Sequence, residues 1–263
     1  MNLRKLAAAL TVPALGLALA ACGGGDEGGT SPSGAKLVKA DTLTICTHLP
    51  YKPFEFNEGG EVVGFDIDVL KIAADAEKLE TEVVNIGWET IVSGEALNSG
   101  KCDVAAGAMT ITEEREKVMD FTEPYFEATQ ALMTKKGAGY ASLDDLAGKT
   151  IAVQEATTGA DYVKENAPKD AKIITLEDSA LMMQAVKSGK ADAGVNDNGL
   201  LYDFVKENTD TEITSEFQTG EAYGFTVKKG GNDKLLEALN KAINDKAAYD
   251  EVYKKWFGEA AAQ

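Results

Sequence analysis

Basic side chains are scarce in this sequence, and histidine occurs once. The 263 residues include 26 Lys and Arg against 43 Asp and Glu, which gives a formal net charge of −17. Nucleic-acid-binding proteins need a basic surface to neutralise phosphates, so this balance argues against nucleic acid as a partner. A zinc site needs closely spaced ligands, and Cys46, Cys102 and His48 do not supply a close pair. We therefore expect no metal and no other cofactor.

Sequence motifs of common enzymes are also missing. The chain contains no Gly-x-Ser-x-Gly elbow, no His-Glu-x-x-His zinc motif and no phosphate loop. We expect a protein that is not an enzyme.

Long apolar runs are absent except at the start of the chain. Basic Arg4 and Lys5 precede an apolar run over residues 6–20, which is too short for a comfortable membrane span and fits a signal peptide. The Leu-Ala-Ala-Cys sequence at 19–22 resembles a bacterial lipobox, in which Cys22 is lipidated; an ordinary signal peptide is the alternative. We expect residues 1–21 to be a lipoprotein signal peptide and the protein to sit on the outer face of the cytoplasmic membrane, held by its lipid anchor only.

The segment after Cys22 has the composition of a linker. Residues 23–35 are rich in Gly and Ser, so we expect residues 22–39 to form a flexible tether. Two cysteines remain beyond it, Cys46 and Cys102. Export favours a disulfide between them, but predicted strand positions allow a separation beyond the bridging limit, so the sequence leaves this pairing open.

After residue 40, short apolar runs alternate with amphipathic stretches. Residues 42–47, 81–86 and 103–109 fit strands around a helix at 66–80, and residues 150–154, 172–176 and 191–195 fit strands around helices from about 160 and over 179–188. This alternation indicates an α/β protein with parallel sheets of βαβ units. Helices at 232–258 would pack on one of the lobes.

A short internal sequence repeat indicates two similarly built lobes. ALNSGKCDV (96–104) and AVKSGKADA (185–193) share the frame Ala-apolar-x-Ser-Gly-Lys-x-Asp. In each we expect a helix to end at a glycine in the left-handed conformation, with a strand two or three residues later. We assign residues 40–128 and 220–263 to lobe 1 and residues 129–219 to lobe 2, with crossovers near 127–130 and 218–221.

An arginine stands where a helix begins. In MTITEEREK (109–117), Thr112 fits an N-cap, and Arg115 then lies in the first turn, where a cation opposes the helix dipole. Pairing with Glu114 or Glu116 on a solvated face is one explanation. The other is an external anion, because a guanidinium, a threonine and free N–H groups suit a carboxylate.

Other polar segments also follow predicted strands. Residues 46–51, 154–159 and 196–199 each lie at the carboxyl end of a strand, where open α/β sheets bind ligands. With the Arg115 segment, they would face one another across a cleft.

Three of these segments resemble the bacterial extracellular solute-binding proteins of family 3, which deliver amino acids to ABC importers. They are LPYKPFEF with EVVGFDIDV (49–56, 61–69), AMTITEEREKVMDFTEPYF (108–126) and GKTIAVQEATTGADY (148–162). The likeness covers nearly all of residues 40–258, and its Thr-Ile-Thr-x-x-Arg part is the most specific. It implies two Rossmann-like α/β lobes, joined by two crossover hinge strands as in type II periplasmic binding proteins, that close on a ligand.

The resemblance assigns the two charges of an amino acid to opposite lobes. It implies that Arg115 forms a bidentate pair with the α-carboxylate, assisted by Thr110 and the backbone N–H of Thr158. Asp197 would accept the α-ammonium, with help from the Ala108 carbonyl and the Thr110 hydroxyl. A zwitterion needs one fixed cation and one fixed anion, so the physical chemistry agrees with this assignment.

Further ligand-binding positions follow from the same segments. Tyr51 and Trp88 match rings that sandwich the ligand side chain, although the segment from Trp88 is two residues longer than is usual in the family. Met109 and Thr157 complete the predicted ligand-binding set, and Thr157 alternatively stabilises only its own turn. Asp197 alternatively is a simple turn residue.

A second set of residues would line the pocket for the ligand side chain. His48 stands where receptors for cationic amino acids often carry Asp, which argues against basic ligands; a packed loop residue is the alternative. Gln154, Glu155 and Asn196 can hydrogen-bond an amide or another polar group. We expect a polar L-amino acid, uncharged or acidic.

The expected partners are an amino-acid ligand and the permease subunits of an ABC transporter, with the receptor itself a monomer. Two alternatives stay open. One is a dehydratase of prephenate-like or arogenate-like acids, with His48 or Glu155 as proton donor. The other is a sensory ligand-binding module with the same binding chemistry.

Overall fold

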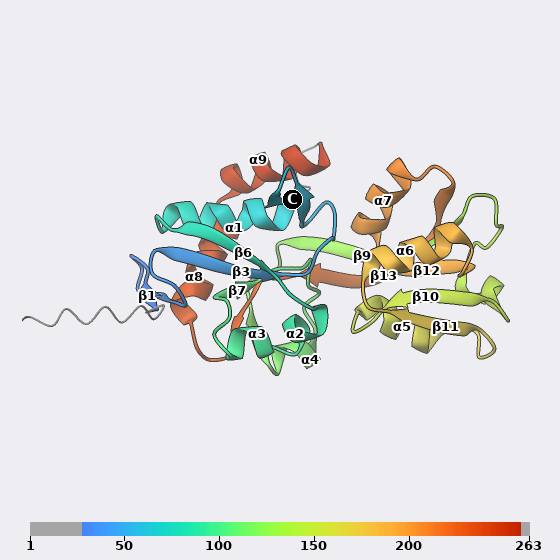
Figure 1. Ribbon diagram of the computed structural model, residues 1–263, viewed down its shortest axis with the longest axis horizontal. Coiled ribbons are helices and arrows are strands. Elements are labelled where there is room, and N and C mark those ends of the chain that lie inside the picture. Colours follow the sequence, from blue (N-terminus) through green and yellow to red (C-terminus); the bar gives the residue numbers. More distant parts are fainter. Residues whose placement is uncertain (1–27, 259–263) are drawn as a thin grey trace, which may run out of the picture.

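The computed structural model describes residues 28–258, so the predicted signal peptide and Cys22 lie outside the described residues. Two lobes lie side by side along the long axis (Figure 1). The sheet of lobe 1 has the order β6-β3-β7-β14-β8. Its strands are β3 (Thr42–Thr47), β6 (Glu80–Asn85), β7 (Val104–Ala105), β8 (Met119–Phe121) and β14 (Thr226–Lys228).

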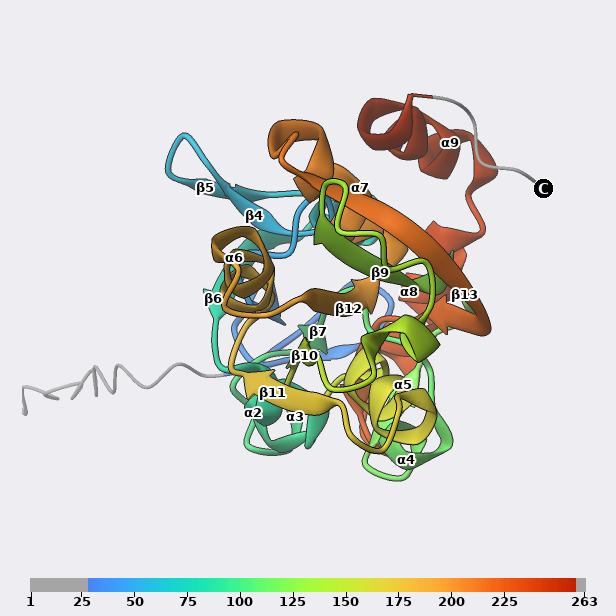
Figure 2. The ribbon, with the colours of Figure 1, turned by 90° about the vertical axis from the view of Figure 1, so that its right-hand side faces the viewer.

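Lobe 2 repeats this plan with a sheet of order β11-β10-β12-β9-β13 (Figure 2). Its strands are β9 (Phe126–Lys135), β10 (Thr150–Gln154), β11 (Lys172–Leu176), β12 (Ala193–Asp197) and β13 (Thr211–Tyr223). The covering elements are the 3-10 helix η1 (Leu143–Leu146) and the helices α5 (Thr158–Asn166), α6 (Ser179–Ser188) and α7 (Asn198–Glu207).

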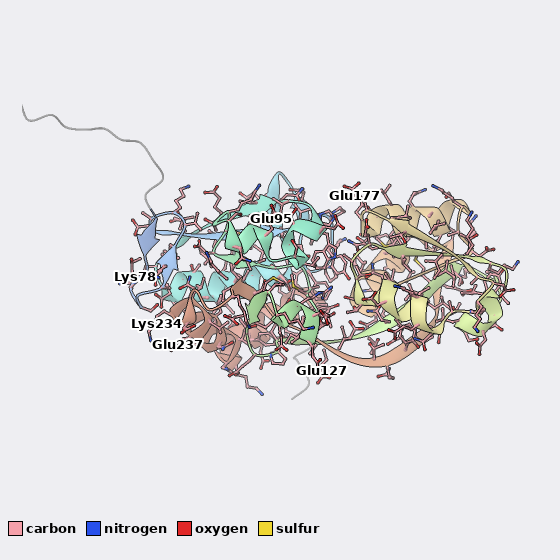
Figure 3. All side chains as sticks on the ribbon, turned by 90° about the horizontal axis from the view of Figure 1, so that it is seen from below. Lys78, Glu95, Glu127, Glu177, Lys234 and Glu237 are labelled. Atoms are coloured by element: carbon pink, nitrogen blue, oxygen red, sulfur yellow. A yellow bond between two sulfur atoms is a disulfide. The ribbon has the colours of Figure 1, made fainter. Side chains whose placement is uncertain are left out.

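The chain crosses between the lobes on two long neighbouring strands. β9 leaves lobe 1 and β13 returns to it, and the two pair antiparallel from Phe126–Tyr223 to Lys135–Thr211. Figure 3 shows Glu127 where these strands pass beneath the cleft. Both sheets are therefore mixed and not purely parallel as predicted, because β9 and β13 in lobe 2, and β14 in lobe 1, run antiparallel to their neighbours.

The helices of lobe 1 pack on both sides of its sheet. On one side, α1 (Phe65–Ala76) packs against the C-terminal helices α8 (Asp233–Ile243) and α9 (Lys246–Phe257). On the other lie α2 (Trp88–Val92), α3 (Glu95–Asn98) and α4 (Glu113–Glu116), and the hairpin of β4 (Phe56–Glu58) and β5 (Glu61–Val63) projects near α1. The predicted docking of residues 232–258 is thus on lobe 1.

Aromatic rings tie the C-terminal helix to the crossover. Phe126, the first residue of β9, packs against Phe54 and Phe257 with ring centroids 5.1 and 5.2 Å apart. Phe65 of α1 also meets Phe257, at 5.1 Å. These contacts bury apolar area at the base of the hinge, so α9 anchors the start of β9 on lobe 1.

The short internal sequence repeat has the same structure in both lobes. Gly100 and Gly189 adopt left-handed backbones, with φ of +70° and +77°, and a strand begins four residues after each, one more than expected. The carboxylate of Asp103 then accepts from the N–H of Thr44 on β3 at 2.8 Å, and that of Asp192 accepts from the N–H of Thr150 on β10 at 2.8 Å. The shared Asp therefore ties the third strand of each lobe to its first.

The prediction of a flexible tether over residues 22–39 is wrong for residues 28–39. Strands β1 (Gly29–Thr30) and β2 (Lys36–Leu37) form a hairpin, and Ala35 and Leu37 are buried in the lobe 1 core. The hydroxyl of Ser31 also donates to the carboxylate of Glu77 at 2.9 Å. Gly and Ser composition concealed a segment that buries its few apolar residues against lobe 1.

Cys46 and Cys102 form a disulfide, with Cα atoms 5.7 Å apart. The bond links the end of β3 to the segment before β7, which pairs with β3.

None of the helices within residues 28–258 is long and apolar enough to cross a lipid bilayer.

Candidate functional site

A cavity lies between the lobes, lined by residues from the ends of β3, β7, β10 and β12. Its volume is about 20 Å³, room for about one water molecule. Side chains of the two lobes contact each other around it. The structure is therefore a closed conformation, and any larger molecule enters the cavity only after the lobes separate. The lining residues are His48, Tyr51, Glu55, Trp88, Gly107, Ala108, Thr110, Arg115, Gln154, Thr157, Thr158, Asn196 and Asp197.

Arg115 is buried in this cavity and does not lie on a solvated face. Thr112 caps α4 by accepting from the backbone N–H of Arg115 at 3.2 Å. The guanidinium then donates to the carbonyl of Thr110 at 2.8 Å and, across the cleft, to that of Ala156 at 3.2 Å. It also lies 5.6 Å from the ring centroid of Trp88. Burial lowers its pKa, whereas the carboxylates of Asp197 and Glu221 act in the opposite direction.

Asp197 is the anionic counterpart on lobe 2. Its carboxylate accepts from Gln130 Nε2 at 2.5 Å, from the Tyr223 hydroxyl at 2.6 Å and from the Tyr51 hydroxyl of lobe 1 at 3.0 Å. Burial first, and then the charge of Glu221, raise the pKa of Asp197 to about 6. All three donors are neutral side chains, so the charge of this carboxylate has no cation in direct contact among the described residues.

Two threonines flank the space between Arg115 and Asp197. Thr110 follows β7 in lobe 1 and bridges to Tyr223 of the crossover strand. Thr158 begins α5 in lobe 2, where the Thr157 hydroxyl caps the helix by accepting from Ala160 N–H at 3.1 Å. Thr157 therefore has two roles: it lines the cavity, and its hydroxyl stabilises its own turn.

A buried acid pair supports the turn that carries Ala108. Asp66 of α1 accepts from the N–H groups of Gly107 and Ala108 at 3.3 and 2.9 Å and from the Tyr125 hydroxyl at 2.8 Å. Burial raises the pKa of Asp66 to about 6, and burial with the neighbouring Asp66 raises that of Glu55 well above its usual range. These bonds hold Ala108 at a φ of +45°, a strained backbone for a residue other than glycine.

The residues predicted to line the pocket for the ligand side chain include two amides and one imidazole that line the cavity. The side-chain oxygen of Asn196 accepts from the Tyr51 hydroxyl at 2.9 Å, and its Nδ2 donates to the side-chain amide oxygen Oε1 of Gln154 at 3.3 Å. His48 Nδ1 lies 2.9 Å from the carbonyl of Ile86. That carbonyl can only accept, so Nδ1 carries a hydrogen. Nε2 is buried and has no hydrogen-bond partner among the described residues.

Two aromatic residues, Tyr51 and Trp88, make contacts between the lobes. The sequence predicts them as rings that sandwich the ligand side chain, and that role stays a prediction. Tyr51 reaches Asn196 and Asp197, and Trp88 Nε1 donates to the Ala156 carbonyl at 3.1 Å. Both rings line the cavity.

Two predicted site residues are not in the cavity. Met109 is fully buried in a lobe 1 core cluster beside the disulfide, because the strand-to-turn geometry points it away from the cleft. Glu155 is exposed to solvent one residue beyond β10. Met109 and Glu155 therefore do not line the cavity in this closed conformation.

Sequence reasoning missed five residues of the site, namely Glu55, Gly107, Gln130, Glu221 and Tyr223. Gln130 and Glu221 fall in the crossovers predicted at 127–130 and 218–221, so the signal was their place next to the cleft. Among residues 28–258, no group of three or more His, Cys, Asp or Glu is arranged to hold a metal ion.

Comparisons with known proteins agree with this geometry. The model of the family described as "Bacterial extracellular solute-binding proteins, family 3" matches residues 43–259. The glutamine-binding protein GlnH of an ABC transporter of Bacillus subtilis is 34% identical, with 93% of this chain and 94% of the relative covered. An ancestral arginine-binding protein, solved with arginine and with glutamine, is 41% identical with a TM-score of 0.77 over 83% of this chain and 99% of that one.

A third relative connects the fold to an enzyme. The ancestral amino-acid-binding protein AncCDT-1, a precursor of cyclohexadienyl dehydratase, is 36% identical with a TM-score of 0.76, covering 82% of this chain and 96% of that one. The comparisons confirm the family and the two-lobed periplasmic-binding-protein fold that the sequence predicts.

Proposed function

Because the chain belongs to the bacterial extracellular solute-binding proteins of family 3, we propose that it is the receptor of an ABC importer. In this proposal it captures a polar L-amino acid, uncharged or acidic, between its lobes and delivers it to the permease. The observation that carries the proposal is that one buried guanidinium on lobe 1 and one buried carboxylate on lobe 2, Arg115 and Asp197, line a single cavity. A zwitterion complements that pair.

The side-chain end of the cavity supports an uncharged polar ligand. The amides of Gln154 and Asn196 offer both donors and acceptors, and His48 lines the same cavity with its buried Nε2 unpartnered among the described residues. Relatives named for glutamine and for arginine show that this fold accommodates different amino acids.

The location and partners belong to the same proposal. The lipobox-like sequence around Cys22 supports a lipid anchor on the outer face of the cytoplasmic membrane. We propose the lobe boundaries near 128 and 220, a monomeric receptor, and ABC permease subunits as the membrane partner. A sensory role would use the same binding chemistry.

The dehydratase alternative rests on the AncCDT-1 likeness. Of the two proton donors considered for it, Glu155 lies outside the cavity, which leaves His48. A receptor that retains its ligand intact therefore fits the cavity better than an enzyme.

A thermal-shift panel of the twenty amino acids tests the proposal, using protein that starts after Cys22 and has been unfolded and refolded to remove any co-purified ligand. A ligand at one hundred times its Kd adds about 2.7 kcal/mol to the unfolding free energy, enough to raise the melting temperature by several degrees. We expect a large shift with one polar amino acid. A response only to Lys and Arg would contradict the proposed specificity, and no response at all would contradict the amino-acid ligand.

A further inference from the structure

Glu221 lies on the crossover strand β13 and joins both lobes at the cavity. One of its carboxylate oxygens, Oε2, accepts from the hydroxyl of Thr110 in lobe 1 and from that of Thr158 in lobe 2, each at 2.8 Å. Gln130 Nε2 on the neighbouring strand β9 lies 3.1 and 3.2 Å from its two oxygens. Three elements thus converge on one carboxylate that neither the sequence nor the family motifs assign to the site.

These contacts fix where the hydroxyl hydrogens point. A carboxylate oxygen can only accept, and a threonine hydroxyl has one hydrogen, so both hydrogens are directed at Glu221. Gln130 Nε2 also lies 3.3 Å from the Thr158 oxygen, but the two hydrogens of this amide are already directed at the carboxylates of Asp197 and Glu221, which are closer. No described residue donates to the Thr110 oxygen, which lines the cavity and is left as an acceptor.

We propose that Glu221 is a positioning residue that holds the Thr110 hydroxyl as an acceptor for the α-ammonium of the ligand. This inference rests on the proposed function. Because Thr158 reaches the same Glu221 oxygen from lobe 2, the arrangement is complete only when the lobes are closed. Glu221 thereby couples recognition of the ammonium to closure.

Charge supports the same role. Gln130 Nε2 contacts the carboxylates of both Asp197 and Glu221, so a second acidic group lies beside Asp197, which lines the cavity together with Arg115. A ligand with a cationic amine is favoured there over one with a neutral group at the same carbon. The site should therefore discriminate strongly between an amino acid and the matching 2-hydroxy acid.

The test compares these two ligands in wild type and in Glu221→Gln by calorimetric titration, with the amino acid that gives the largest thermal shift. The amide keeps the size of the side chain but removes its charge, and its oxygen is a weaker acceptor for the two threonine hydroxyls than a carboxylate oxygen. We expect affinity for the amino acid to fall about tenfold or more and affinity for the 2-hydroxy acid to change little. A purely structural role of Glu221 would lower the affinities for both ligands equally. An unchanged ratio of the affinity for the amino acid to that for the 2-hydroxy acid would therefore overturn the proposal.

Matched variants separate the possible failures. Glu216→Gln makes the same change on the same strand, where Glu216 accepts from Thr129 at 2.8 Å on the exposed side, and should leave the ratio unchanged. If Glu221→Gln does not fold, Thr110→Val removes the proposed acceptor directly and should lose the same discrimination. Wild type that binds no amino acid would overturn the proposed function itself, whereas normal wild-type binding with an unaffected ratio in Glu221→Gln or Thr110→Val overturns only the role of Glu221.

Discussion

At the scale of single residues, the site depends on one buried cation at an unusual place. Arg115 sits in the first turn of a four-residue helix and is 9% exposed. Its two carbonyl partners, on Thr110 and Ala156, cannot neutralise its charge. A ligand carboxylate can, which accounts for a guanidinium that the helix dipole alone would disfavour.

Replacing this guanidinium should reduce ligand affinity sharply. In Arg115→Lys the charge remains, but the bidentate geometry and the bond across the cleft are lost. We expect binding to weaken by about 2 kcal/mol or more, roughly thirtyfold, in calorimetric titration. Lys117→Ala, which removes an exposed cation from the same segment, should leave affinity unchanged. Equal affinities for Arg115→Lys and wild type would contradict the assignment.

The pH dependence of binding should follow Asp197. Its pKa is raised to about 6 by burial and by Glu221, so the carboxylate loses its charge as the pH falls through 6. Affinity for the α-ammonium should then fall, about tenfold for each further pH unit. Titrations at about pH 5 and pH 7 check this, with Asp197→Asn as the variant whose residual binding lacks the Asp197 contribution. Equal affinity at both pH values would contradict it.

The stability of the ligand-free protein should respond to pH in the opposite sense. Because the folded-state pKa of Asp197 lies above its ordinary value of 3.8, the folded protein binds the proton more tightly than the unfolded chain between these values. This group therefore makes the free energy of unfolding decrease as the pH rises from about 4 to about 6. Asp66, whose pKa is also raised to about 6, acts in the same direction.

The sequence predicted the charged residues of the site better than it predicted the other residues that surround the cavity. Arg115, Asp197 and Tyr51 lie where the sequence placed them, because each follows the carboxyl end of a strand. Met109 and Glu155 also follow strands, but a shift of one position along an extended chain turns a side chain to the opposite face. The sequence does not specify that register.

At the scale of elements, three strands and one helix were predictable to the residue, whereas β6, β7 and β12 have other bounds than the predicted 81–86, 103–109 and 191–195. β3, β10 and β11 and helix α6 have the predicted bounds. The short antiparallel strands β8 and β14 were not predicted, because strands of three residues carry little periodicity. The β1–β2 hairpin was hidden for another reason, since its stability comes from docking on lobe 1 and not from its own composition.

The disulfide is an element-scale constraint within lobe 1. It links residues 56 positions apart, and both cysteines are buried in a core cluster that also contains Trp88. The double variant Cys46→Ala/Cys102→Ala should lose about 2–4 kcal/mol of unfolding free energy, because the unfolded chain regains the freedom of that loop. Denaturant unfolding measures the loss, and titration should show ligand affinity within a few-fold of wild type. Unchanged stability would contradict this expectation.

At the scale of the whole molecule, the ligand site exists only when the lobes are together. Lobe 1 supplies Arg115, Thr110 and Trp88, and lobe 2 supplies Asp197 and Thr158. At the mouth of the cleft, Lys52 of lobe 1 also pairs with Glu207 of α7 at 2.8 Å. A ligand that touches both lobes lowers the free energy of the closed state and not that of the open one, which shifts the population towards closure.

The central claim is that both charges of one zwitterion are recognised, one by each lobe. The most direct measurement is calorimetric titration of the wild-type protein with three matched compounds. These are the amino acid selected by the thermal-shift panel, its decarboxylated amine and its 2-hydroxy acid.

Our account predicts that only the intact amino acid binds tightly, and that each analogue binds at least about one hundredfold more weakly because a buried partner is left unpaired. Comparable affinity for either analogue would contradict the pairing of Arg115 and Asp197 with a single ligand.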